Sequence, residues 1–179
     1  MLFHLFSDII ITLILNLDKG EFQMQKTNAI RMLEKAKIPF STIEYEVDEN
    51  DLSGVHIAES INRNPDTVFK TLVTRGDKRG YTVFCIPCNK EVDLKKAARI
   101  TGDKKIEFVQ VKELLPLTGY IRGGCSPIGM KKKFPTYMDY TAKNYDEITV
   151  SGGMRGLQIV INPNDLINFT EAICEDFTV

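Results

Sequence analysis

Helix and strand signals alternate at short intervals from residue 24 to the C-terminus, and this spacing restricts the fold more than any other feature. Helical periodicity or capping marks five short segments: residues 28–38, 55–61, 93–102, a turn at 113–115, and a last helix that begins at Asn162-Pro163. Strand patterns occupy residues 43–47, 69–75, 81–87, 106–109, 136–140, 148–151 and 157–161. This interspersed order predicts an α+β (mixed α/β) fold with helices packed around one mixed β-sheet.

Composition limits the class of protein. Hydrophobic residues make up 43% of the 179 residues, which excludes a disordered chain. The formal net charge of −1 excludes a surface that is basic throughout, although a local basic patch is compatible with it. Four cysteines at irregular spacing are too few for a disulfide scaffold and are typical of cytosolic thiols.

The first 23 residues differ from the rest of the chain. They open with an apolar run that lacks a basic residue in front of it, which makes a poor signal peptide and a marginal membrane span. Lys19-Gly20-Glu21 can be encoded by a purine-rich stretch that resembles a bacterial ribosome-binding site upstream of Met24. We therefore expect residues 1–23 to be a misplaced N-terminal extension, and residues 24–179 to form one domain. A peptide from residues 1–23 in the mass spectrum of the natural protein would contradict this expectation.

Several kinds of catalysis lack the residues they need. The two histidines are His4 and His56, so a Ser-His-Asp or Cys-His system depends on His56, a lone helical histidine more typical of packing or the surface. Cys85 and Cys88 form one C-x-x-C pair, which is a weak signal for a metal or redox site without further ligands nearby. No metal and no cofactor is expected.

Lys70 interrupts an apolar strand. Alternation places it on the same face as Val68 and Leu72, with Phe69 and Thr71 on the other face. A lysine in that position either belongs to a binding pocket or protects an edge strand against aggregation, and the residues alone leave both interpretations open.

Two glycine-rich segments are the remaining candidate sites. Residues 119–129 contain more glycine than a simple turn needs, so the backbone there can approach a ligand and donate N–H groups to its oxygens. Residues 151–156 join two strands, either as a hairpin with bulge glycines or as a pocket wall. Basic residues at 131–133 follow the first segment and suit a polyphosphate partner.

Taken together and in order, the motifs resemble the YbaK/EbsC family of aminoacyl-tRNA deacylases. The resemblance covers the chain from about Met24 to its C-terminus and is carried by these segments: KTNAIRMLEKAKIPF, VFKTLV, DLKKAARITGDKK, TGYIRGGCSPIGMKKKFPTYMD and VSGGMRGLQI. It implies a barrel-like mixed sheet surrounded by helices. It also implies a cytoplasmic trans-editing factor that hydrolyses mischarged Cys-tRNA(Pro), with Cys-tRNA(Cys) as a further substrate.

The resemblance also assigns residues. The pocket lysine of the family falls on Lys70, which would anchor a terminal phosphate or polarise the ester, and the strand tyrosine falls on Tyr45. Backbone amides of Gly123 and Gly124 would hold the ester oxygen as negative charge develops. The other substrate-binding residues expected within the matching motifs are Thr71, Ser126, Ser151, Gly152, Gly153 and Arg155.

In the mechanism that the family implies, the thiol of the substrate attacks its own ester. The protein therefore positions the reacting groups and does not supply a nucleophile. The near-neutral chain is expected to select tRNA weakly and to gain specificity through prolyl-tRNA synthetase. Two alternatives remain: an Ala-tRNA(Pro) deacylase with an activated water, and a non-catalytic regulatory binding module. No membrane partner is expected.

Overall fold

The computed structural model describes residues 26–179, so the expectation about residues 1–23 lies outside the described residues. The α-helices in this range are α2 (Asn28–Ala36), α3 (Gly54–Ser60), α4 (Leu94–Thr101), α5 (Val111–Thr118) and α6 (Pro163–Thr170), with 3-10 helices η1 (Pro65–Thr67) and η2 (Tyr140–Asn144). The strands are β1 (Phe40–Glu44), β2 (Val68–Gly76), β3 (Tyr81–Pro87), β4 (Ile106–Phe108), β5 (Thr136–Asp139), β6 (Ile148–Ser151), β7 (Leu157–Ile161) and β8 (Ile173–Glu175). Within residues 26–179, no helix is long and apolar enough to cross a membrane.

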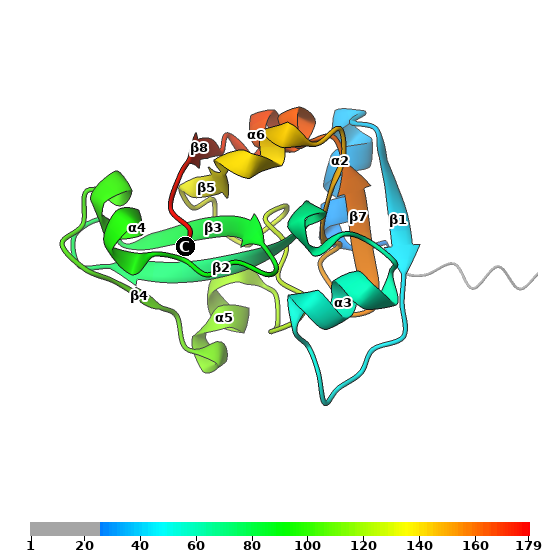
Figure 1. Ribbon diagram of the computed structural model, residues 1–179, viewed down its shortest axis with the longest axis horizontal. Coiled ribbons are helices and arrows are strands. Elements are labelled where there is room, and N and C mark those ends of the chain that lie inside the picture. Colours follow the sequence, from blue (N-terminus) through cyan, green and yellow to red (C-terminus); the bar gives the residue numbers. More distant parts are fainter. Residues whose placement is uncertain (1–25) are drawn as a thin grey trace, which may run out of the picture.

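The strands form one mixed sheet. Its order is β1-β7-β6-β2-β3-β5-β8, with β4 paired to β2 beside this path. β2 and β3 are antiparallel, whereas β6 runs parallel to β2 and β5 runs parallel to β3. In Figure 1, β2 and β3 lie across the middle of the molecule while β1 and β7 stand nearly upright beside them, so the sheet curls strongly along its length. This confirms the expected mixed architecture.

Several expected elements are confirmed, one strand has other bounds than expected, and one strand is additional. The hairpin β2–β3 and the last helix, with Asn162 as its cap and Pro163 as its first residue, form as predicted. The strand expected at residues 43–47 instead spans Phe40–Glu44 because its partner β7 begins at Leu157, opposite Glu44, and the ladder ends there. β8 was not predicted, since three residues are too few to show a strand pattern.

The side chains of β2 divide among three apolar clusters. Phe69 and Val73 pack into the main core, Leu72 packs against the cluster under α4, and Val68 joins a small cluster under α3. Because neighbouring residues of a strand point to opposite faces, β2 is covered on both sides. It is the central strand of the molecule.

One edge of β2 is shared by two strands that do not meet. β6 pairs with β2 at Val68 and Phe69, β4 pairs with it at residues 74–76, and neither strand pairs with residues 70–73. The carbonyl of Val73 faces this edge, where it accepts a hydrogen bond from the Val109 amide at 3.0 Å, whereas the Val68 carbonyl faces β3. Main-chain groups alternate in direction along a strand, so those of Thr71 point into the gap between β6 and β4.

A reciprocal pair of aspartates fixes the β4 side of this gap. Asp77, in the β2–β3 turn, accepts hydrogen bonds from the amides of Lys104 and Lys105 in front of β4. In return, Asp103 accepts hydrogen bonds from the amides of Lys78 and Arg79 at 2.8 and 2.9 Å. We call these contacts the aspartate clamp, because they tie the hairpin turn to the segment that delivers β4.

Candidate functional site

A pocket of about 590 Å³ opens at the gap in the β2 edge. One wall is β2 itself, from Val68 to Val73, and the start of α3 forms another. Residues 109–114 with the loop at 122–125 close a third side, while Ser151 of β6 and Gln158 of β7 contribute from the neighbouring strands. The interruption of the sheet is therefore what creates the cavity, since a continuous β6–β2 ladder would fill it.

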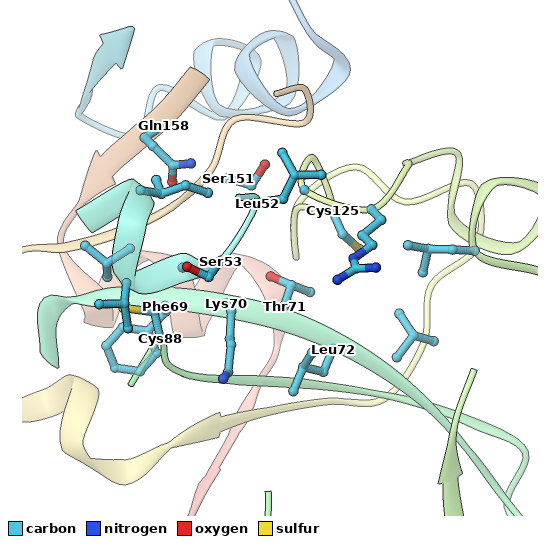
Figure 2. A pocket seen from close by; sticks show the side chains of 18 of the residues that line it. Leu52, Ser53, Phe69, Lys70, Thr71, Leu72, Cys88, Cys125, Ser151 and Gln158 are labelled. Carbon is cyan, nitrogen blue, oxygen red and sulfur yellow. The ribbon is translucent and has the colours of Figure 1, made fainter. Parts of the chain in front are cut away.

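Lys70 lies in this pocket and forms an ion pair. Its Nζ is 3.2 Å from Oε1 of Glu91, and its side chain is 25% exposed, against 74% for Glu91. Figure 2 shows the amine on the side of β2 away from Ser151 and Cys125, as alternation along the strand requires. Lys70 is thus a pocket residue, and the protective edge-strand alternative does not describe its surroundings.

The structure brings together four of the ten residues expected to form the site. Lys70, Thr71, Gly123 and Ser151 all line the pocket, although they come from three distant parts of the sequence. The Ser151 hydroxyl accepts a hydrogen bond from the Gly153 amide at 3.3 Å, which leaves its own hydrogen to donate into the pocket. Six further residues lie outside the lining: Tyr45, Gly124, Ser126, Gly152, Gly153 and Arg155.

The two glycine-rich segments pack directly against each other. A Cβ added at Gly124 would lie 3.1 Å from backbone atoms of Met154 and Arg155, and one added at Gly152 would lie 2.6 Å from Leu157. The Gly124 amide donates a hydrogen bond to the Ile121 carbonyl at 3.0 Å. That donor is therefore already used within the loop, and close packing of Gly124 on Met154 and Arg155 holds the loop that carries Gly123.

Three of the outlying residues serve the loops that surround the pocket. Arg155 donates from Nε to the Arg122 carbonyl at 2.9 Å and forms an ion pair with Glu49, so it links the glycine loop to the segment in front of α3. The Tyr45 amide donates to the Gly156 carbonyl at 3.0 Å, and the half-buried ring packs on the cluster under α3. Ser126 is fully buried, and its hydroxyl accepts from the Ile128 amide.

The pocket contains two thiols. Burial raises the pKa of Cys125 to about 12, with a hydrogen bond to Thr118 opposing the shift only in part. Burial also raises the pKa of Cys88, although the positive charge of Lys70 lowers it to some extent. Cys85 is fully buried in β3, and burial raises its pKa to about 12. All three stay protonated near neutral pH, and a protonated thiol is a poor nucleophile.

Other candidate chemistry is not gathered here. His56 lies on α3 outside the pocket lining, with its ring nitrogens 4.0 Å from carboxylate oxygens of Asp48 and Asp51. Among residues 26–179, no group of three or more His, Cys, Asp or Glu side chains is arranged to hold a metal ion. The pocket therefore supplies shape, hydrogen-bond donors and two cations, Lys70 and Arg122.

The sequence analysis did not single out five polar residues of the pocket lining: Ser53, Asn89, Glu91, Arg122 and Gln158. Gln158 is only 3% exposed and lies opposite Ser151 in the β6–β7 register. The sequence did contain a signal for Gln158, because it is the polar residue in the otherwise apolar run LQIVI. A polar side chain in a buried strand is expected to have a hydrogen-bond partner. Glu91 carried no comparable signal, because an acidic residue between a strand and a helix is ordinary on a surface.

Comparisons with known proteins agree with this fold and pocket. The family model described as an aminoacyl-tRNA editing domain matches residues 53–169. The Enterococcus faecalis protein EbsC, named as a proposed Cys-tRNA(Pro)/Cys-tRNA(Cys) deacylase, is 48% identical over 154 residues, which cover 86% of this chain and 94% of EbsC. The Bacillus subtilis protein YwhH is 25% identical over 125 residues, covering 67% of this chain and 79% of YwhH.

Among solved structures, a proposed trans-editing enzyme for prolyl-tRNA synthetase superposes with a TM-score of 0.75. It is 24% identical, and the match covers 85% of this chain and 95% of that one, so it establishes the fold. The family model defines the class of protein, an aminoacyl-tRNA editing domain. The chain belongs to the aminoacyl-tRNA editing-domain family, and its class of activity is aminoacyl-tRNA deacylation.

Proposed function

We propose that the protein hydrolyses mischarged Cys-tRNA(Pro), and also Cys-tRNA(Cys), with the thiol of the substrate as nucleophile. The observation that carries this proposal is the content of the pocket: its own thiols are held protonated by burial, and His56 lies outside the lining. A reaction in which the substrate supplies the nucleophile needs neither a thiolate of the protein nor a histidine base. The 48% identity with EbsC supports the cysteinyl substrate.

The proposed reaction proceeds in two steps. The cysteine thiol loses its proton, and the sulfur attacks the ester carbonyl carbon. The tetrahedral intermediate then expels the 3′-terminal ribose oxygen, which takes up a proton. The product of this step is a four-membered thiolactone, and water opens that strained ring to free cysteine. The protein contributes by holding sulfur and carbonyl in contact and by stabilising the oxyanion.

The pocket offers groups for each task. The Gly123 amide and the Ser151 hydroxyl are the donors proposed for the oxyanion, since both line the pocket. Lys70 is proposed to anchor the phosphate of the terminal nucleotide. The direction of its amine, away from Ser151 and Cys125, favours this role over polarising the ester. Thr71 offers its main-chain groups at the gap, where they can pair with the terminal nucleoside.

The finer assignments of partner and compartment also belong to this proposal. Prolyl-tRNA synthetase is the proposed partner, because it releases Cys-tRNA(Pro) after admitting cysteine, an amino acid close to proline in size. The cytoplasm is the proposed location, where aminoacyl-tRNAs are made and used. An editing protein with a net charge of −1 needs such help to select one tRNA.

The test is hydrolysis of Cys-tRNA(Pro) and Ala-tRNA(Pro) by the full chain and its Lys70→Ala variant, with Lys143→Ala as the control for an exposed lysine outside the pocket. We expect rapid loss of the cysteinyl ester only. In Lys70→Ala, kcat/KM is expected to fall about 10- to 100-fold, the typical effect of losing one charge-assisted contact to a phosphate.

Equal hydrolysis of both esters would contradict the substrate-thiol mechanism and would indicate an activated water. Binding of both without turnover would indicate a regulatory module instead. Lys143→Ala with a loss equal to that of Lys70→Ala would show that general charge, rather than the pocket lysine, sets the rate.

A further inference from the structure

Glu91 is the acidic residue of the pocket lining. The charged side chains that line it are Lys70, Arg122 and Glu91, and Glu91 contacts Lys70 at 3.2 Å. The Glu91 carboxylate therefore occupies the position beside the Lys70 amine that a nucleotide phosphate would take. The family match does not assign any role to this residue.

The backbone of Glu91 is fixed while its side chain is exposed. Its carbonyl accepts a hydrogen bond from the Val179 amide at 3.1 Å, and the next residue, Val92, forms a β-bridge with Thr178. The carboxylate itself is 74% exposed. The C-terminal segment thus fixes the point from which the side chain extends, and the side chain is free to turn toward solvent.

An ion pair with one partner this exposed is weak, because water solvates the Glu91 carboxylate and salt screens the pair. A nucleotide phosphate carries a comparable charge and can bring further contacts from the rest of the nucleotide. Lys70 can therefore exchange its carboxylate partner for a phosphate at little cost. While both anions are present, they repel each other.

We propose that Glu91 is a positioning residue that holds the Lys70 amine in the empty pocket and opposes the nucleotide phosphate for it, so that it sets the affinity for the substrate. This inference rests on the proposed phosphate-anchoring role of Lys70. Glu91 offsets part of the charge of the Lys70 amine and thereby lowers the affinity of the pocket for the phosphate of a terminal nucleotide. Release of deacylated tRNA is faster as a result.

The experiment is an NMR titration of the full chain with adenosine 5′-monophosphate and, separately, with adenosine. In Glu91→Gln, the affinity for the monophosphate is expected to rise about two- to five-fold, the range of a weak exposed ion pair. The affinity for adenosine is expected to stay unchanged. The matched control is Glu171→Gln, which removes an equally exposed carboxylate paired with Lys133 outside this pocket, and it should alter neither affinity.

The double variant Lys70→Met/Glu91→Gln tests whether Glu91 acts through Lys70. Relative to Lys70→Met alone, it is expected to show no gain in affinity for the monophosphate. An unchanged or lower affinity in Glu91→Gln, an equal gain for adenosine, or a gain that survives in the double variant would overturn the proposal. Hydrolysis of Cys-tRNA(Pro) by the unaltered chain is measured in parallel, so that failure of the proposed function is seen separately.

Discussion

Cys88 and Cys125 place two thiols in a pocket proposed for a thiol-bearing substrate. The three pKa shifts described above all have burial as their largest cause, and they all favour the neutral thiol. The thiol of a cysteinyl ester enters the pocket from water, where its pKa is the ordinary one, and it lies next to the ester carbonyl that it attacks. The proposed nucleophile is therefore the thiol of the substrate, whereas the buried thiols of the protein contribute to packing.

We predict that Cys88→Ala changes kcat/KM for Cys-tRNA(Pro) by less than about three-fold. The rate is expected to rise as the pH increases from 6 toward 8.5, because the thiolate of the substrate forms over that range. The profile should coincide in the two proteins after subtraction of spontaneous hydrolysis. The measurement is single-turnover deacylation across this pH range, with circular dichroism as the check on folding.

Cys174→Ala provides a control, since this half-buried thiol lies outside the pocket lining. If Cys88→Ala abolished turnover in a folded protein, or shifted the profile while Cys174→Ala did not, a protein thiol would be the nucleophile.

At the scale of elements, the aspartate clamp holds the hairpin turn to the segment before β4. Asp103 is 8% exposed and also accepts a hydrogen bond from the Thr101 hydroxyl at 2.8 Å. Burial would raise the pKa of its carboxyl, but the hydrogen bonds from Arg79, Lys78 and Thr101 outweigh burial, so the pKa is lowered overall. The charged form is thus the one that stabilises the fold.

We predict that Asp103→Asn lowers the free energy of unfolding by about 1–3 kcal/mol at pH 7, the cost of leaving buried donors without a charged acceptor. A carboxyl whose pKa is lowered in the folded state stabilises at neutral pH, and this contribution disappears as the pH falls through that value. The difference between the variant and the unaltered chain should therefore shrink as the pH falls below about 4, the ordinary pKa of an aspartate. Urea unfolding at pH 7 and pH 3 measures it, and Asp146→Asn, at an exposed carboxylate, is the control.

An equal loss of stability at pH 3 and pH 7 would contradict this account of the clamp. Because the clamp delivers β4 to the edge of β2, Asp103→Asn should also weaken binding of adenosine 5′-monophosphate. An unchanged affinity in the destabilised variant would show that the pocket does not depend on the position of β4.

The elements that could be predicted from the sequence are those whose signal is local. The β2–β3 hairpin, with its polar turn, and α6, with its Asn-Pro start, follow from neighbouring residues. The end of β1 depends on where β7 begins, more than 100 residues later. At the site, Lys70 was visible as a charge in an apolar strand. The hydrogen bond from the Gly124 amide to Ile121 and the ion pair of Glu91 with Lys70 depend on the tertiary fold, so no local sequence pattern predicts them.

At the scale of the whole molecule, the charge is nearly balanced. A net charge of −1 gives no general attraction to RNA. The pocket offers two cations for phosphate contacts: Lys70, proposed above for this role, and Arg122. For a single-stranded 3′ end, each phosphate contact contributes a slope of about −0.7 to the dependence of log affinity on log salt.

We therefore predict a shallow salt dependence, with a slope of about −0.7 if Lys70 alone contacts a phosphate and about −1.4 if Arg122 does so as well. Cys-tRNA(Pro) and Cys-tRNA(Cys) should be deacylated within about three-fold of each other by the isolated protein. Addition of prolyl-tRNA synthetase should raise the rate for Cys-tRNA(Pro) selectively. The measurement is kcat/KM for both substrates between 50 and 200 mM salt, values chosen to span the usual range.

A slope several times steeper, or strong selection between the two tRNAs without the synthetase, would show that the protein reads the body of the tRNA directly. The basic tract at residues 131–133 would then be the first surface to alter.

The gap in the β2 edge makes part of the pocket wall out of main chain, at Thr71. Peptide groups are the same whatever side chains a lineage acquires, so this part of the wall survives substitution. Side chains such as Cys88, Leu52 and Cys125 fill the remaining walls. Evolution can therefore resize the chamber for another amino acid, one side chain at a time, while the peptide groups proposed to pair with the shared end of every tRNA persist.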